Sequence, residues 1–332
     1  MNVLVGDIGG TKTILAIFSS EAGPRAALFE KTFSSTHYAS LELIVQEFLA
    51  ETDIPVQKAC FAVAGPVVGG SAQITNLTWV VDGNALKEAF HLQSVALLND
   101  LESVAYAVPV LQAEDIHTLC AGTPVAGGSI AVLAPGTGLG EAFLTDQNGS
   151  YHAHPSEGSH ASFGPVGRLQ IGLLEYLNAQ GFRHVSCERV CSGGLGIPNL
   201  YAYLKSTGLY SEPAWLAEQL AASEDPTPVI FAAGQDEAQP CELASAVLDL
   251  FVEILAAEAG NLALKILSTG GIYLGGGISP RILAYLQKPN FLEQLRSKGR
   301  FYQMLANMPV HVILNAKAGL MGAAFFGLNL PA

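Results

Sequence analysis

The stretch Val5–Phe18, VGDIGGTKTILAIF, contains a glycine turn that resembles a phosphate-binding loop but departs from the Walker A pattern. Counted from Gly6, that pattern requires glycine at position 11, where this chain has Thr11 ahead of Lys12 and Thr13. Apolar and β-branched residues flank the glycines on both sides, so the order predicted is strand, turn, strand. A P-loop or a dinucleotide-binding motif has a helix directly after its glycines. The stretch therefore predicts a glycine hairpin of another architecture.

The same order recurs in SIAVLAPGTGLGEAFLTDQNGS, residues 129–150. This segment predicts a strand at 129–134, a glycine turn at 136–140 and a strand at 141–145. It fails the dinucleotide-binding pattern G-x-G-x-x-G because the last glycine is replaced by Glu141. A glycine turn presents backbone N–H groups with no side chains in the way, which suits phosphate oxygens. Two such hairpins indicate two related α/β halves that face one another.

The length of 332 residues favours two domains. Strand-like and helix-like stretches alternate, which favours mostly parallel sheets with helices on their faces. We expect a small α/β domain from 1–108 plus about 303–332, and a large α/β domain from 109–302. The last helix, in NAKAGLMGAAFFGL, is rich in small residues, and we expect it to return to the first domain and pack closely there.

The charge balance excludes several classes of partner. The net charge is −13, from 16 Lys and Arg against 29 Asp and Glu, and the basic residues form no cluster. Nucleic acid and anionic membrane surfaces are therefore not expected partners. A small anionic ligand remains compatible, because salt confines the repulsion to roughly 10 Å at about 0.1 M. It would have to be held locally, by backbone N–H groups or a metal ion.

The cysteines and the apolar tracts indicate a soluble cytoplasmic protein. The N-terminus lacks the Lys or Arg of a signal peptide, and Asp7 interrupts its apolar run. The long apolar tract at 242–267 carries Asp249, Glu253 and Glu258, so it predicts an amphipathic helix and no membrane span. The C-x₃-C pair has no partner pair for zinc, so we expect five free thiols, at Cys60, Cys120, Cys187, Cys191 and Cys241.

Five motifs stand in one order along the chain: Asp7 with Gly9-Gly10-Thr11, LLND at 97–100, APGTGLG at 134–140, EGSH at 157–160 and LGGGI at 274–278. In this order and at these intervals the sequence resembles the bacterial glucokinases, which belong to the sugar-kinase, actin and heat-shock chaperone ATPase superfamily. The resemblance runs nearly end to end. It implies a two-domain actin-like (ribonuclease H-like) ATPase fold, with mixed sheets flanked by helices and a cleft between domains. It also implies transfer of a phosphoryl group from ATP to the 6-hydroxyl of glucose.

The glycine turns are the expected site of ATP and Mg²⁺. Their N–H groups would bind the β- and γ-phosphates, and the Asp7 carboxylate would hold Mg²⁺ or its waters. A turn-capping role is the alternative for Asp7, and an exposed turn lysine is the alternative for Lys12. The LGGGI motif would let the backbone approach adenine and ribose. The expected nucleotide-binding residues are Gly6, Asp7, Ile8, Gly9, Gly10, Thr11, Lys12, Gly136, Thr137, Gly138, Gly275 and Gly276.

The expected sugar site centres on Asp100, at the junction of a predicted strand and helix. The helix N-terminus favours its ionised form, and the resemblance implies that Asp100 takes the proton from the sugar 6-hydroxyl. The alternative is that Asn99 or Asp100 is a plain N-cap, and that Glu188 is an ordinary helix-surface charge. The expected sugar-binding residues are Asn99, Asp100, Glu157, His160 and Glu188, with Gly65, Pro66 and Asn76 bordering the pocket.

One departure narrows the resemblance, and three alternatives stay open. Sugar kinases of the ROK group carry a cysteine-rich zinc motif soon after E-x-G-H, and this chain has none there, which favours the zinc-free glucokinase branch. A kinase for mannose, fructose or N-acetylglucosamine is the first alternative. A non-catalytic sugar-binding module and an actin-like assembly ATPase are less favoured. Members of the family are commonly dimers, so a homodimer is expected.

Overall fold

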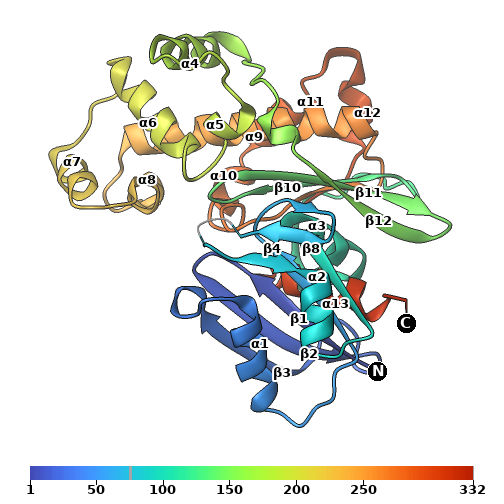
Figure 1. Cartoon of the computed structure of the whole chain (residues 1–332). Coiled ribbons are helices and arrows are strands. Elements are labelled where there is room, and N and C mark those ends of the chain that lie inside the picture. The colour runs from blue at the N-terminus through green and yellow to red at the C-terminus, as the bar shows by residue number, and fades with distance from the viewer. Residues whose placement is uncertain (75–76, 332) are drawn as a thin grey trace. The chain divides into compact units, whose positions relative to one another are not determined.

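The computed structural model describes residues 1–74 and 77–331 (Figure 1). The chain forms two compact units. The first contains 1–116, 142–155 and 315–332, and the second contains 117–141 and 156–314. The first unit thus takes in 142–155, which we expected in the larger domain. In that segment the backbone of Ala153 hydrogen-bonds to Tyr106, a residue of the first unit.

The first unit is built on a five-stranded mixed sheet with the order β3-β2-β1-β4-β8. Strand β1 is antiparallel to β2 and parallel to β4, and β8 continues parallel to β4. The bounds are β1 Asn2–Ile8, β2 Lys12–Ser19, β3 Ala27–Ser34, β4 Lys58–Val63 and β8 Ser94–Asn99. The predicted order of strand, glycine turn and strand at the N-terminus is confirmed.

Helices and a small sheet complete the first unit. Their bounds are α1 Leu41–Ala50, α2 Gly83–Ala89, α3 Asp100–Ala107 and α13 Ala318–Leu328, with β5 Val67–Val68, β6 Ser71–Gln73 and β7 Val80–Asp82. Helix α13 packs so closely on α3 that a Cβ atom at Gly322 would overlap the backbone oxygen of Ser103. The hydroxyl of Ser103 donates to the Gly319 carbonyl at 2.6 Å. The expected return of a small-residue helix to the first domain is confirmed.

The second sheet has six strands in the order β12-β11-β10-β13-β14-β9. Strand β13 is parallel to both β10 and β14. Strand β11 runs from the second unit into the first, since the division falls between Glu141 and Ala142. The bounds are β9 Ile116–Cys120, β10 Ile130–Pro135, β11 Leu139–Gln147, β12 Ser150–Ser156, β13 Gly271–Leu274 and β14 Val310–Ile313.

The second unit is rich in helices, and the longest of them, α9, lies among the others (Figure 1). Its bounds, Glu242–Ile266, match the tract expected to be an amphipathic helix. Side chains on nearly all sides of α9 are buried, and even Glu258 is only 6% exposed. The expectation of one apolar face was therefore wrong, because helices and β10 cover α9 on several sides. The other helices are α4 Gly167–Ala179, α5 Cys187–Val190, α6 Gly196–Ser206, α7 Ala214–Ala221, α8 Pro226–Gln235, α10 Leu283–Leu286, α11 Pro289–Arg296 and α12 Tyr302–Ala306.

Two further expectations concern thiols and membranes. All five cysteines are free, as expected. Within residues 1–74 and 77–331, no helix combines the length and the apolar character needed to cross a membrane.

Candidate active site

The first glycine turn, Gly9–Thr11, connects β1 to β2. The N–H of Gly9 donates to the carbonyl of Lys12 at 3.0 Å, which closes the turn. Ser35, fully buried, holds the turn from outside: its hydroxyl donates to the Gly9 carbonyl at 2.8 Å and its N–H donates to the Thr11 carbonyl at 2.9 Å. Sequence analysis missed Ser35. It lies more than twenty residues from the turn and belongs to no motif.

Gly6 and Ile8 lie inside strand β1 and not in the turn. A Cβ atom at Gly6 would lie 2.6 Å from the Phe61 ring and 2.8 Å from Ile8 Cδ1. Ile8 itself is buried in the core of the first unit. Packing alone therefore explains glycine at position 6, and only the backbone of these two residues is left for a nucleotide contact.

Asp7 and Asp100 are close enough for their charges to interact. The pKa of Asp7 is raised, first by burial and then by the negative charge of Asp100, while Lys12 acts in the opposite direction. Gly319 of α13 leaves space beside Asp7, since a Cβ atom there would lie 3.8 Å from Asp7 Oδ2. Lys12 is exposed. The first glycine turn and the expected base thus share one electrostatic environment.

Asn99 is the N-cap of α3. Its Oδ1 accepts from the N–H of Leu101 at 3.0 Å and of Glu102 at 3.4 Å, and its Nδ2 donates to the Gly65 carbonyl at 3.1 Å. Gly65 has φ +146°, a conformation that favours glycine. The same side chain that caps α3 also ties the Gly65–Pro66 turn to the start of that helix. Asn76, also expected at this border, lies outside the described residues.

Asp100 is the first residue of α3 and is exposed. Its Oδ1 accepts from the N–H of Leu101 at 2.9 Å. Glu102 completes the cap, because its Oε2 accepts from the Asn99 N–H at 3.3 Å. Burial raises the pKa of Glu102. Sequence analysis missed Glu102, although Asn followed three residues later by Glu is a capping-box signal.

The second glycine turn, Gly136–Gly138, is held by two further glycines. The N–H of Gly193 donates to the Gly136 carbonyl at 2.7 Å, and the N–H of Gly194 donates to the Thr137 carbonyl at 2.9 Å. A Cβ atom at either glycine would lie within 3.0 Å of those same carbonyls. The sequence patterns gave this glycine pair no role, because it belongs to none of the five motifs.

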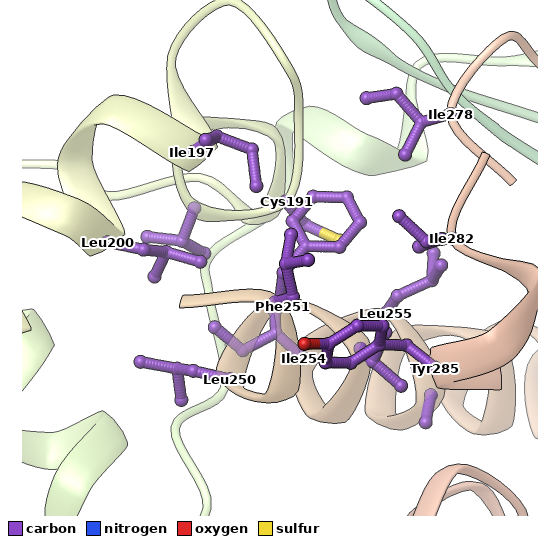
Figure 2. Close-up of a cluster of buried hydrophobic side chains, with 14 of the residues drawn as sticks. Cys191, Ile197, Leu200, Leu250, Phe251, Ile254, Leu255, Ile278, Ile282 and Tyr285 are labelled. Atoms are coloured by element: carbon purple, nitrogen blue, oxygen red, sulfur yellow. The ribbon is translucent and has the colours of Figure 1, made fainter. Parts of the chain in front are cut away.

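An apolar core supports this turn. Ile278, which a Cβ atom at Gly193 would approach to 3.0 Å, belongs to the same buried cluster as Cys191 and Ile197. Figure 2 shows these side chains with Phe251 of α9 in that cluster. The turn therefore rests on a packed core, which limits its freedom to move.

Gly275 and Gly276 lie beside the second glycine turn. The N–H of Gly275 donates to the Leu133 carbonyl of β10 at 2.7 Å. Gly276 has φ +74°, and a Cβ atom there would be 2.5 Å from the Pro135 carbonyl, so only glycine fits. The two motifs of the second unit that were expected to bind nucleotide are thus brought together.

The turn Glu157–His160, which is expected to bind sugar, is paired with Glu188 of α5. His160 Nε2 lies 3.5 Å from Glu157 Oε2, and His160 Nδ1 lies 3.2 Å from Glu188 Oε2. A Cβ atom at Gly138 would lie 2.8 Å from Glu188 Oε1. The three expected sugar-binding residues of the second unit are therefore together, and Glu188 also borders the second glycine turn.

Solved structures with this fold define the class of protein. The crystal structure of glucokinase from an Antarctic psychrotroph matches with a TM-score of 0.84 and 32% identity, covering 99% of both chains. A ROK family glucokinase from Streptomyces griseus, solved in complex with glucose and AMPPNP, matches with a TM-score of 0.64 and 20% identity, covering 98% of this chain and 99% of that chain. That second likeness concerns the fold alone. The protein is therefore of the class of sugar kinases that have the two-domain actin-like ATPase fold.

Sequence comparisons identify the family. The glucokinase of Nostoc sp. is 41% identical over 340 residues, and that of Nostoc punctiforme is 39% identical over 341 residues. Each alignment covers 99% of this chain and 99% of the relative. A glucokinase family model matches residues 4–329. The chain belongs to the glucokinase family.

Proposed function

We propose that this protein transfers the γ-phosphoryl group of ATP to the 6-hydroxyl of D-glucose, giving glucose 6-phosphate and ADP. The observation that carries the proposal is the contact of Glu188 with both the sugar-binding turn and the second glycine turn. The Glu188 carboxylate thus lies next to side chains suited to bind sugar hydroxyls and next to a glycine turn suited to bind phosphate, in a chain of the glucokinase family.

Glu157, His160 and Glu188 bind the glucose hydroxyls. Glu157 and His160 have side chains that are 76% and 56% exposed, so they are accessible to a ligand, whereas Glu188 is 22% exposed. Carboxylates accept from hydroxyls, and an imidazole can donate or accept. Asn99 has one remaining amide hydrogen after its cap and Gly65 bonds, which leaves it able to donate once to the sugar.

Asp100 is the general base. A carboxylate at the first position of a helix is stabilised in its ionised form by the N-terminal N–H groups. Asp100 is exposed in this structure, so its carboxylate is accessible to the 6-hydroxyl of a bound sugar. Proton transfer to a positioned base contributes typically 10²–10⁴-fold in rate.

ATP binds the two glycine turns and the backbone at Gly275–Gly276, with Lys12 at the phosphates. Asp7 suits Mg²⁺. Burial and the negative charge of Asp100 raise the pKa of Asp7, so a nearby divalent cation would stabilise its ionised carboxylate. When bound, Mg²⁺ would neutralise charge on the phosphates. The protein residues contribute the binding, the orientation and the acceptor for the proton.

The proposed activity also suggests where in the cell the protein works and in which oligomeric state. We place the reaction in the cytoplasm, at the glucose-phosphorylation step of glycolysis, because five free thiols suit a reducing compartment. A homodimer is proposed on the resemblance to the family alone. A kinase for another hexose and a non-catalytic sugar-binding module are not favoured, since near-full-length identity of 39–41% is to glucokinases.

A coupled ADP-release assay across hexoses, with and without Mg²⁺, tests the proposal. We expect the highest kcat/KM with glucose, much lower values with mannose, fructose and N-acetylglucosamine, and no turnover when Mg²⁺ is chelated. Sites that hydrogen-bond each hydroxyl reject an analogue lacking one contact by up to about 10⁴-fold. A higher kcat/KM with another hexose would assign the alternative substrate, and no hexose-dependent ADP release would contradict the kinase assignment.

A further inference from the structure

Glu141 is a buried carboxyl for which the proposed reaction has no use. It lies near the start of β11, is 1% exposed, and neither carboxylate oxygen has a hydrogen-bond partner within the described residues. Burying a carboxyl group without partners is costly, and far more so when the group is ionised. Such a group calls for an explanation in terms of what surrounds it.

One side of Glu141 faces the sugar-binding turn. A Cβ atom at Gly158 would overlap Glu141 Oε2 and would lie 3.0 Å from Ser156 Oγ. Gly158 is not among the glycines with positive φ, so its backbone would accept any residue. Glycine at 158 therefore leaves room for the Glu141 carboxyl, which lies against the turn that carries Glu157 and His160.

The charged and titratable groups around Glu141 come from three elements. Helix α9 contributes Glu258 and Lys265, α5 contributes the Cys187 thiol, and the turn itself carries Glu157 and His160, with Glu188 of α5 beyond them. Burial, reinforced by Glu258 and opposed by Lys265, raises the pKa of Glu141 to about 7. A hydrogen bond with the Cys191 thiol, together with burial, raises the pKa of the Cys187 thiol well above its ordinary value.

We propose that Glu141 is a positioning residue for the sugar-binding turn: its neutral carboxyl lets the turn keep the arrangement described above, and its ionised carboxylate disrupts that arrangement. This inference rests on the proposed function, because it assigns Glu157 and His160 to the sugar.

The hydrogen bonds of the turn explain the coupling. The N–H of Gly158 donates to Ser156 Oγ at 3.0 Å, that of His160 to the Glu157 carbonyl at 3.0 Å, and that of Ala161 to the Gly158 carbonyl at 2.9 Å. These donors are already in use. An ionised Glu141 would have to recruit one of them or admit water, and either change moves the backbone that carries Glu157 and His160.

The consequence is a glucose affinity that falls as pH rises. If only the form with neutral Glu141 binds sugar well, the apparent Kd increases as the fraction of that form decreases. With Glu141 titrating near neutral pH, the apparent glucose Kd should rise by at least about fivefold between pH 6.5 and pH 8.5. ATP affinity should follow this profile much less, since the Glu141 carboxyl lies against Gly158 of the sugar-binding turn.

The test compares wild type with Glu141→Gln, which keeps the shape of the side chain and cannot ionise. Glucose Kd is measured by calorimetry without nucleotide, and glucose and ATP KM by steady-state kinetics, from pH 6 to pH 9. Glu253→Gln is the matched control, because the pKa of Glu253 is also raised by burial but this glutamate faces Asp249 and Asn290. We expect the control to keep the wild-type slope and Glu141→Gln to lose most of it for glucose only. Equal slopes in wild type and Glu141→Gln would overturn the inference while leaving the kinase assignment intact.

A second pair of variants tests the contact if Glu141→Gln folds poorly. Gly158→Ala should raise the glucose KM by about tenfold or more, because the new methyl group overlaps the carboxyl. Adding Glu141→Ala removes the overlap, so the double variant should recover part of the lost affinity. A double variant no better than Gly158→Ala would overturn the inference. Failure of wild type to bind glucose at any pH would overturn the proposed function and this inference together.

Discussion

Asp7 and Asp100 show how the chemistry of single residues depends on their neighbours. Each occupies the end of a β-strand or the start of a helix, which a local sequence pattern can identify. Their mutual repulsion, and the space left by Gly319, depend on the folded arrangement of β1, α3 and α13. The identity of both residues was therefore predictable, and the raised pKa of Asp7 was not.

The first prediction concerns the pKa of Asp7. Asp100→Asn removes a negative neighbour and should lower that pKa, whereas Lys12→Gln removes a positive neighbour and should raise it. Carboxyl ¹³C chemical shifts of labelled protein, followed from pH 3 to pH 9, measure it directly.

The direction of the change in the Asp7 pKa also predicts how the pH dependence of activity changes. Asp7 has to be ionised to bind a cation, so the acid limb of kcat/KM should move to higher pH in Lys12→Gln, whatever the loss in its maximum. A titration of Asp7 that is the same in Asp100→Asn and wild type would show that the two carboxylates do not interact.

The structural role of Glu141 could not be predicted from the sequence. In the sequence it was only the residue that breaks a dinucleotide-binding pattern. In the fold its carboxyl is buried against Gly158 and has no hydrogen-bond partner in the part of the chain that the structure describes. No periodicity or spacing reveals such a contact, because Gly158 and Glu258 approach Glu141 from distant parts of the chain.

At the scale of elements, each glycine turn depends on a second segment that fixes it. Ser35 holds the first turn, and Gly193 with Gly194 holds the second, in both cases by hydrogen bonds to turn carbonyls. The hairpins themselves follow from strand propensity and glycine placement, so they were predictable. Their supports act across long stretches of chain and carry no local signal.

Ser35→Ala tests whether this support matters to the nucleotide. The change leaves the Gly9 carbonyl and the Thr13 hydroxyl without a buried partner, which costs about 1–3 kcal/mol. We expect the ATP KM to rise severalfold or more while the glucose KM changes by less than about twofold. Steady-state kinetics with each substrate varied in turn gives both values.

Ser34→Ala is the matched control, since the Ser34 hydroxyl pairs with Thr36 at an exposed position. It should leave both KM values close to wild type. If Ser35→Ala raised the glucose KM and spared the ATP KM, the first glycine turn would not be a nucleotide turn.

At the scale of the molecule, the sequence predicts the class of fold and the family, and the comparisons confirm both. Five motifs in order carried that prediction, since each is short and only the set is specific. The buried state of α9 and the inclusion of 142–155 in the first unit were missed, because they depend on how helices and hairpins pack. Local sequence patterns indicate strands and turns, whereas the burial of α9 on several sides depends on how the whole unit packs.

The central claim is that Asp100 takes the proton of the glucose 6-hydroxyl during phosphoryl transfer from ATP. The direct measurement is glucose-dependent ADP release by Asp100→Asn and Asp100→Ala, with glucose Kd measured by calorimetry on the same preparations. We predict that kcat falls by about 10²–10⁴-fold while glucose binding remains measurable in both variants. Turnover within a few-fold of wild type in either variant would contradict the account.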